Sequence, residues 1–370
     1  MRWLFVAQDG WGLGHVSRQL GLARELRRLR PGDEMLFLTY SDATHLIAAE
    51  GFASVKLPSP EWFKPADKRR IDDLLRLRVA TAVVGATATT YQPDAVVIDT
   101  FPVGNRGEFA ILRRVPCARF LITREVVNPL PQWEYHESLP RFTALIAPYA
   151  EGEIALKATE GTPLHWVGPI MVRSRDDLLG RNEARRRLDL PQEGRVCLVA
   201  FGGGGNPIYA RLEAWVRQLA AQHPAWCFAF ATPPLLQGAV AEAGAENIRR
   251  FAYYPVAECY SAFDAAISTV GSSAYELASM GVPSILVTDV SPQQDEDFLL
   301  KAQRIVGANG GFVVRGFDTP ALESAFAAMD DPARLAAMTA DRAALKLENG
   351  ARTAAALLAR YTDKIASRRA

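Results

Sequence analysis

The first residues able to do chemistry follow a short apolar run at the start of the chain. Residues 10–15 read GWGLGH, so three glycines lead into His15. Glycines allow a tight backbone turn close to a ligand, and a helix N-terminus favours negative charge there. We interpret His15 as a general base. The alternative is a histidine that makes one structural hydrogen bond at the start of a helix.

Two carboxylates follow later apolar runs. Asp99 ends one predicted strand, and Glu125, which follows the next, is a second candidate base. Ligands of open α/β sheets bind beyond the carboxyl ends of the strands, so Asp99 belongs on the same rim as His15. A carboxylate bonded to one imidazole nitrogen fixes the tautomer and strengthens the base at the other. Capping of the next turn is the alternative for Asp99, and an ion pair with Arg124 is the alternative for Glu125.

The second half of the chain carries four consecutive glycines between a predicted strand and a predicted helix. They are Gly202, Gly203, Gly204 and Gly205, with Asn206 as the expected helix cap. Bare backbone N–H groups in such a loop bind a diphosphate without a metal ion. Because the loop lacks the Gly-Lys-Ser/Thr ending of a P-loop, an NTPase is a poor interpretation.

A similar turn follows a later strand, formed by Gly271, Ser272 and Ser273. Glu276 lies in the short helix that comes next, where its carboxylate can accept both hydroxyls of a ribose. The alternative is a capping box between Ser273 and Glu276. After the predicted strand 284–288, two side chains are well placed for sugar hydroxyls: Gln293 and Gln294.

Apolar runs alternate with helix-period segments along the chain, which predicts an α/β fold with parallel sheets. The pattern restarts near residue 196, so we expect two facing Rossmann-like β/α/β domains with a cleft between them. Their expected bounds are 1–168 and 169–350. A last helix, predicted from about residue 331 onward, is expected to pack its final part, 351–370, back on the first domain. Strands are predicted at 3–7, 35–40, 95–99, 118–123, 144–147, 196–201, 226–230, 265–268 and 284–288.

The composition excludes several classes of protein. A chain of 370 residues with 49% apolar residues can bury two cores, and a net charge of +1 disfavours a nucleic-acid binder. Four cysteines without C-x-x-C spacing predict neither disulfides nor a zinc site. No signal peptide or membrane span is predicted, so we expect a cytoplasmic protein. The basic run 64–70 leaves peripheral membrane contact open, although such runs are more often solvated loops.

These motifs, in this order, resemble the GT-B glycosyltransferases over nearly the whole chain. The matching residues are Gly12, Gly14, His15 and Arg18, the loop 202–205, and Gly271, Glu276, Gly281 and Pro283. Within that fold the chain is similar to the N-acetylglucosaminyltransferase family that forms lipid II. The resemblance implies a nucleotide-sugar donor, a UDP-sugar first and a dTDP-sugar second, and an inverting transfer. It implies no metal or other cofactor.

The resemblance also assigns roles to residues. It implies that Glu276 binds the ribose, that the glycine loop binds the diphosphate, and that Gln293 and Gln294 hold the sugar. The backbone of Phe251, Ala252 and Tyr253 would read the base, and Arg173 would reach the nucleotide from the linker. Gly12, Gly14 and Arg18 would line the acceptor side. Because the segments 57–72 and 126–137 depart from the family, the resemblance does not imply that this chain uses the family's acceptor.

Three other functions stay open. The segments 14–18 and 271–294 also resemble the UDP-sugar hydrolase of pseudaminic acid biosynthesis, although extra segments at the acceptor face favour transfer. Nucleotide-sugar 2-epimerisation would call for more carboxylates around the sugar. A non-catalytic nucleotide-sugar-binding protein is the remaining alternative if His15 and the carboxylates do not converge.

Overall fold

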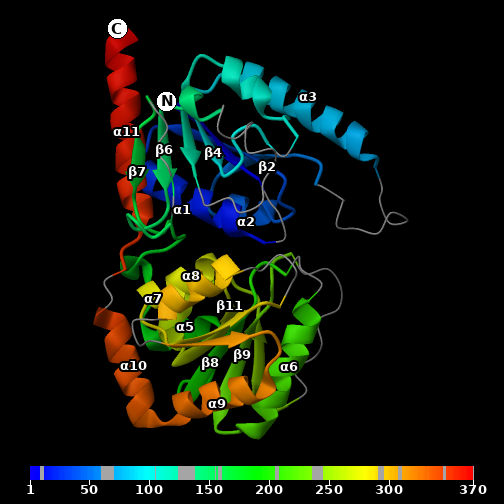
Figure 1. The fold of residues 1–370 in the computed structure, drawn as a ribbon, viewed down its shortest axis with the longest axis vertical. Helices are drawn as coiled ribbons and strands as arrows, with labels where there is room; N and C mark the ends of the chain where they lie inside the picture. The colour runs from blue at the N-terminus through cyan, green and yellow to red at the C-terminus, as the bar shows by residue number, and fades with distance from the viewer. Residues whose placement is uncertain are drawn as a thin grey trace. The chain divides into compact units, whose positions relative to one another are not determined.

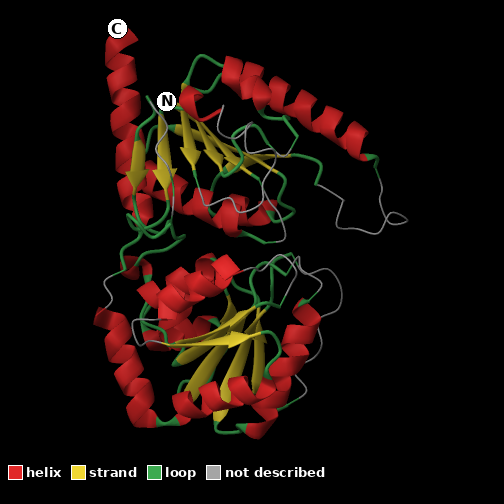
Figure 2. Ribbon diagram, viewed as in Figure 1, coloured by secondary structure: helices red, strands yellow, loops and turns green. Residues whose placement is uncertain are grey.

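The chain forms two compact α/β units, each built on one parallel sheet (Figures 1 and 2). One unit is Met1–Ile170 with Gly350–Ala370, and the other is Met171–Asn349. We refer to them as unit 1 and unit 2. The computed structural model describes residues 1–8, 12–59, 71–104, 106–123, 138–154, 156, 161–204, 208–235, 245–290, 296–306, 311–344 and 347–369.

Unit 1 holds a seven-stranded sheet in the order β3-β2-β1-β4-β5-β6-β7. The strands are β1 (Arg2–Ala7), β2 (Glu34–Thr39), β3 (Ala53–Lys56), β4 (Ala95–Asp99), β5 (Ala118–Ile122), β6 (Ala144–Ala147) and β7 (Leu164–Trp166). The helices are α1 (Gly14–Leu29), α2 (Thr44–Ala49), α3 (Asp73–Tyr91) and α11 (Gly350–Arg369), with 3₁₀ turns η2 (Ala110–Arg114) and η3 (Leu139–Arg141).

The two faces of this sheet are covered by different helices. Alternate β1 residues, Leu4 and Val6, pack in a core with Ala80 and Val84 of α3. The other face carries stacked aromatic rings such as those of Trp3 and Phe120, and α1 and α11 pack together over it. The C-terminal helix α11, red in Figure 1, thus completes unit 1 although it follows unit 2 in the chain.

Unit 2 holds a six-stranded parallel sheet in the order β10-β9-β8-β11-β12-β13. The strands are β8 (Arg195–Ala200), β9 (Trp226–Ala231), β10 (Ile248–Phe251), β11 (Ala265–Thr269), β12 (Ser284–Thr288) and β13 (Gly311–Arg315). The helices are α5 (Arg181–Arg187), α6 (Tyr209–Gln222), α7 (Ser272–Ser279), α8 (Glu296–Val306), α9 (Thr319–Asp330) and α10 (Pro332–Ala344), with 3₁₀ turns η4 (Arg175–Asp177) and η5 (Val256–Ala262).

The strand β8 shows how this sheet is buried on both faces. Cys197 and Val199 pack in the core that includes α6 and α9, whereas Val196 and Leu198 pack with α5 and η5. Such a strand reads as a continuous apolar run, because neither face meets water. The prediction of parallel α/β sheets in two Rossmann-like domains is therefore confirmed.

Each sheet has one point at which its strand order changes direction. In unit 1, β1 lies between β2 and β4, so the chain moves outward on one side and later returns to the other. In unit 2 the same change occurs between β8 and β11. Such switch points leave a crevice at the carboxyl ends of the two central strands, where ligands of open α/β sheets bind.

The prediction of one helix from residue 331 onward is wrong. The structure has α10 in unit 2 and a separate α11 in unit 1, with a break before Gly350. At Gly350 a Cβ atom would lie 2.4 Å from the carbonyl oxygens of both Val167 and Gly168. The chain therefore passes too close to another backbone for any side chain at this position. Across the described residues, every helix is too short or too polar to serve as a membrane span.

Candidate functional site

His15 and Asp99 meet at the switch point of unit 1. His15 lies in the first turn of α1, which follows β1, and Asp99 is the last residue of β4. His15 Nδ1 is 3.2 Å from Asp99 Oδ1. Since β1 and β4 are neighbours in a parallel sheet, their carboxyl ends share one edge. The structure thus brings the predicted histidine and carboxylate together.

Arg18 binds the same carboxylate with two hydrogen bonds. Its Nε donates to Asp99 Oδ2 and its Nη2 to Asp99 Oδ1, each over 2.9 Å. His15 and Arg18 are three residues apart on α1 and therefore lie on one face of the helix. Sequence reasoning placed Arg18 on the acceptor side, whereas in the structure two of its nitrogens bind Asp99.

The Asp99 carboxylate is fully buried and yet ionised. Burial alone would raise the pKa of Asp99, but the charges of Arg18 and His15 and their hydrogen bonds outweigh it and hold that pKa well below its usual range. With Asp99 accepting at Nδ1, the imidazole carries its proton on Nδ1, and Nε2 carries the lone pair that a general base needs. The alternative of Asp99 as a turn cap does not hold for its side chain, which accepts from His15, Arg18 and Thr100 instead.

Thr100 is a part of this site that sequence reasoning missed. Its φ of 66° lies in the left-handed region, which β-branched residues rarely enter. Its N–H donates to the Ile122 carbonyl over 2.8 Å and its hydroxyl to Asp99 Oδ1 over 2.7 Å. Backbone strain of this kind costs on the order of 1–3 kcal/mol and persists where the surroundings enforce it, often at functional sites.

Gln8 is a second residue that no motif indicated. It directly follows β1 and is 1% exposed, and among the described residues neither side-chain amide atom has a hydrogen-bond partner. Tyr40 likewise follows β2 directly; its hydroxyl donates to Glu108 over 3.0 Å, and Glu108 also accepts the Arg106 N–H. Burial, followed by the charge of Glu108, raises the pKa of Tyr40. The only sequence signal for Gln8 was a polar residue directly after a buried strand.

The glycine turn before His15 is described from Gly12 onward. α1 begins at Gly14 with Leu13 as its N-cap residue, and Leu13 makes no side-chain cap. A Cβ atom added to Gly12 would meet no atom of the described residues within 4 Å. The other predicted base of this unit, Glu125, lies outside the described residues.

In unit 2 the quadruple-glycine loop follows β8 at the second switch point. Gly202 and Gly204 adopt φ values of 72° and 82°, which larger residues disfavour. The Gly203 carbonyl accepts the Leu235 N–H over 2.8 Å. α6 begins at Tyr209 with Ile208 as its N-cap residue, and the expected cap at Asn206 stays a prediction. Gly205 and Asn206 lie outside the described residues.

The second turn of unit 2, at Gly271, Ser272 and Ser273, follows the neighbouring strand β11. Gly271 is the N-cap residue of α7, and no side chain caps this helix. The Ser268 hydroxyl donates to the Ala200 carbonyl of β8 over 2.8 Å, and its oxygen lies 3.5 Å from Ser273 Oγ. Both glycine turns therefore lie at the same carboxyl edge, and among the described residues neither N-cap residue, Ile208 of α6 or Gly271 of α7, caps its helix with a side chain.

Glu276 does not form the capping box that was considered for it, because α7 begins at Ser272. Its Oε1 accepts the backbone N–H of Val172 over 3.1 Å, and the residue is 8% exposed. Burial raises the pKa of Glu276 to about 7, against the lowering effects of the Val172 N–H and the charge of Arg173. A carboxyl group in this state is half protonated near neutral pH and can donate or accept a hydrogen bond.

Arg173 and the 251–253 segment form one polar network. The Arg173 Nε lies 2.5 Å from Glu258 Oε1, and the Tyr253 hydroxyl donates to Glu258 Oε2 over 2.7 Å. Phe251 ends the edge strand β10, where its carbonyl accepts the Thr232 N–H, and Ala252 is exposed beyond it. Arg173 is thus engaged by Glu258 and only 5% exposed. Gln293 and Gln294 lie outside the described residues.

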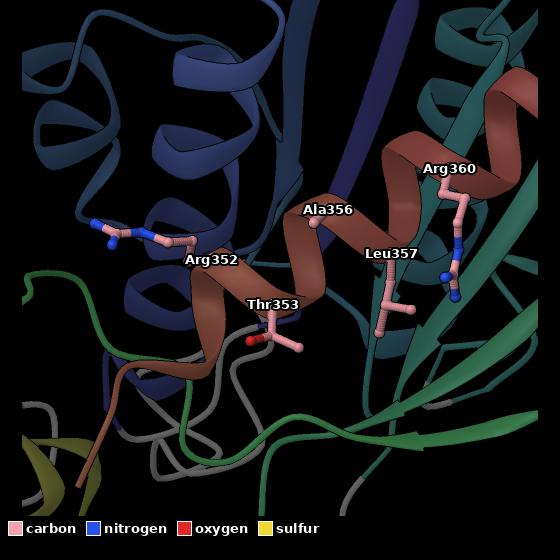
Figure 3. A pocket seen from close by; sticks show the side chains of 5 residues that line it. All are labelled: Arg352, Thr353, Ala356, Leu357 and Arg360. Atoms are coloured by element: carbon pink, nitrogen blue, oxygen red, sulfur yellow. The ribbon is translucent and has the colours of Figure 1, made fainter. Parts of the chain in front are cut away.

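A hollow of ≈ 430 Å³ lies elsewhere on unit 1, along α11 (Figure 3). Its described lining comes from that one helix, namely Arg352, Thr353, Ala356, Leu357 and Arg360. None of these residues belongs to the His15–Asp99 group, and none follows a sheet strand. This hollow is therefore not the site that the switch points indicate.

No protein-family model matches this chain, and no curated protein sequence matches it. Several solved structures match the chain. The calicheamicin glycosyltransferase CalG4 is 18% identical with a TM-score of 0.62, covering 99% of each chain. MurG of Acinetobacter baumannii is 15% identical with a TM-score of 0.61, covering 97% of this chain and all of its own.

A third likeness is to the UDP-GlcNAc 2-epimerase of Neisseria meningitidis bound to UDP-GlcNAc. It is 12% identical with a TM-score of 0.60, and the match covers 98% of this chain and 100% of the epimerase. At such identities the comparisons establish the fold and leave the reaction open. The chain has the GT-B fold, as its sequence motifs predicted.

Proposed function

We propose that this protein is a glycosyltransferase that moves a sugar from a nucleotide diphosphate onto an acceptor hydroxyl. The observation that carries the proposal is the His15–Asp99 pair, joined over 3.2 Å at the switch point of unit 1. The GT-B fold, shared with CalG4 and MurG, supports it. A UDP-sugar is the donor we favour, and a dTDP-sugar is the alternative.

In the reaction, His15 acts as the general base. The acceptor hydroxyl gives its proton to His15 Nε2 while its oxygen attacks the anomeric carbon. The bond from that carbon to the diphosphate oxygen breaks, and the nucleoside diphosphate leaves with the electron pair. Asp99 stabilises the imidazolium that forms. Direct displacement of this kind inverts the anomeric centre.

Unit 2 would hold the donor without a metal ion. Its two glycine turns present backbone N–H groups beside the N-termini of α6 and α7, and such groups stabilise the charge of a departing diphosphate. Glu276 would bind the ribose, and the exposed backbone at Ala252 would read the base. We retain Gln293 and Gln294 as proposed contacts of the sugar.

The donor site is tested by thermal-shift titration with UDP, dTDP, GDP and CDP, with and without EDTA. A ligand bound only by the folded state raises the melting temperature. We expect the largest rise with UDP or dTDP, and we expect it to survive EDTA. No rise with any of the four nucleotides would end the proposal.

A matched pair of variants locates the binding. Gly202 and Gly194 both adopt positive φ, and a Cβ atom added to either meets nothing within 4 Å. Gly202→Ala and Gly194→Ala therefore impose similar backbone strain on unit 2. Only Gly202→Ala is expected to abolish the nucleotide-induced rise. Equal losses in both variants would count against the loop as the diphosphate site.

Hydrolysis and epimerisation use the same class of donor. His15 could equally take a proton from water, and the likeness to a 2-epimerase keeps the third reaction open. UDP-N-acetylglucosamine labelled in the sugar separates the three. Transfer labels an acceptor from a cell extract, hydrolysis releases free labelled sugar without any acceptor, and epimerisation yields the epimeric UDP-sugar.

A further inference from the structure

We propose that Arg18 is a positioning residue that compensates the charge of Asp99, so that His15 remains an uncharged base at neutral pH. The inference deepens the proposed function, on which it rests for the role of His15. It concerns a charge balance inside unit 1 and can be measured without substrate.

Arg18 makes more and shorter contacts with the Asp99 carboxylate than His15 does. Both Asp99 oxygens accept from Arg18 over 2.9 Å, whereas His15 reaches one of them over 3.2 Å. A guanidinium is planar, permanently charged and suited to such bidentate contacts. Asp99 is therefore already neutralised by one full positive charge before His15 takes up a proton.

The same guanidinium also acts on the imidazole directly. Arg18 Nη2 lies 3.5 Å from His15 Nδ1. In a pair of histidine and aspartate alone, the carboxylate favours the charged imidazolium; a second cation at this distance opposes it. The side chains of His15 and Arg18 are 15% and 16% exposed and that of Asp99 is fully buried, so solvent screens these charges weakly.

Other contacts keep Asp99 from turning away from Arg18. The Thr100 hydroxyl also donates a hydrogen bond to Asp99 Oδ1. Thr100, whose backbone is strained, is the next residue in the chain. Within the described residues, Arg18 is the permanently charged group that acts on Asp99, and His15 adds a charge only when it is protonated. Removing the Arg18 charge therefore shifts the balance toward the protonated form of His15.

The competing explanation is that Arg18 serves stability alone, as buried ion pairs often do. The two explanations differ in what happens to His15. A purely structural arginine leaves the pH at which the His15 ring titrates unchanged once the variant is folded. Loss of a charge-compensating arginine changes that pH.

The experiment is NMR titration of the protein labelled with ¹⁵N in its histidine rings. The chain has five histidines, and His15→Gln identifies the signal of interest. In Arg18→Met we expect the titration midpoint of His15 to rise by about one to two pH units, a tenfold to hundredfold change in the protonation ratio. Arg18→Lys keeps the charge and should restore most of the wild-type midpoint.

Arg24→Met is the matched control. Arg24 lies on the same helix at similar exposure, 15%, and its Nε lies 3.4 Å from Glu50 rather than near Asp99. We expect less than about half a pH unit of change at His15 there, because the lost charge is remote. If Arg18→Met fails to fold, Arg18→Gln replaces it, since its amide still donates to Asp99 without a charge.

A folded Arg18→Met or Arg18→Gln protein with an unchanged or lowered midpoint would overturn the inference. Thermal shifts with UDP on the same samples keep this outcome separate from the proposed function. We expect wild type and Arg18→Met to respond equally to UDP. If wild type does not respond to any nucleotide, the proposed function fails while the titration still decides the role of Arg18.

Discussion

The buried carboxyl of Glu276 makes the stability of unit 2 depend on pH in an unusual direction. Burial raises its pKa from 4.5 to about 7. Between these values the folded protein holds a proton that the unfolded chain has released. Stability is therefore highest below pH 4.5 as far as this group is concerned, falls as the pH rises toward 7, and stays low above it. Most paired carboxylates do the opposite.

The size of the effect follows from the two pKa values. Their difference of about 2.5 corresponds to about 3 kcal/mol of unfolding free energy at pH 8. Glu276→Gln removes the ionisable group but keeps an oxygen that can accept the Val172 N–H. We expect the variant to be more stable than wild type at pH 8, by up to about 3 kcal/mol, and to lose this advantage near pH 4.5.

Urea unfolding of both proteins at pH 5, 6, 7 and 8 measures this directly. The exposed carboxylate Glu193 in the same unit supplies the control, because Glu193→Gln should change the curve little at any pH. The reasoning is refuted if the stability gap between Glu276→Gln and wild type stays constant from pH 5 to 8. If Glu276 also binds the ribose, the stabilised variant will show a smaller thermal shift with UDP.

Three further outcomes follow from the described contacts. Asp99→Asn should lower turnover about 10²- to 10⁴-fold while leaving the UDP thermal shift intact, because it removes the charge that supports the His15 imidazolium; a normal rate would exclude the pair. Gln8→Leu should raise the melting temperature by about 2–4 °C in calorimetry, since it removes a buried amide that has no partner among the described residues. A fall would show that the amide is satisfied. Gly350→Ala should lower the unfolding free energy, measured in urea, by about 1–3 kcal/mol, because its Cβ would meet two carbonyl oxygens. An unchanged value would show that the backbone between α10 and α11 moves to make room for the methyl group.

The central strands of both sheets were predictable, and the edge strands were not. The predicted strands at 95–99, 144–147 and 284–288 match β4, β6 and β12. The four strands without a prediction are β3 and β7 of unit 1 and β10 and β13 of unit 2, which are the two edges of each sheet. Edge strands are partly exposed and carry polar residues, such as the two arginines of β10, so they lack a continuous apolar run.

The candidate site was predictable in its positions more than in its contacts. Asp99 and His15 were placed at one rim because parallel strands share their carboxyl edge, and the structure joins them. The Arg18 contact had a local signal, the three-residue spacing from His15 on a helix, that was not used. The Val172 contact of Glu276 had none, since 104 residues separate the two and only the packed unit 2 brings them together.

The two switch points differ in the chemistry that they present, and this difference supports a division of labour. At the first, between β1 and β4, the polar groups are a histidine, a buried carboxylate and an arginine whose charges nearly cancel, which suits the movement of a proton. At the second, between β8 and β11, glycine turns precede two helix N-termini whose N-cap residues, Ile208 and Gly271, make no side-chain cap; N–H groups at such termini suit an anion. A protein that only bound nucleotides would need the second alone. The Asp99 carboxylate, buried at a desolvation cost and held by three neighbours beside strained backbone, supports the proposed reaction over binding alone.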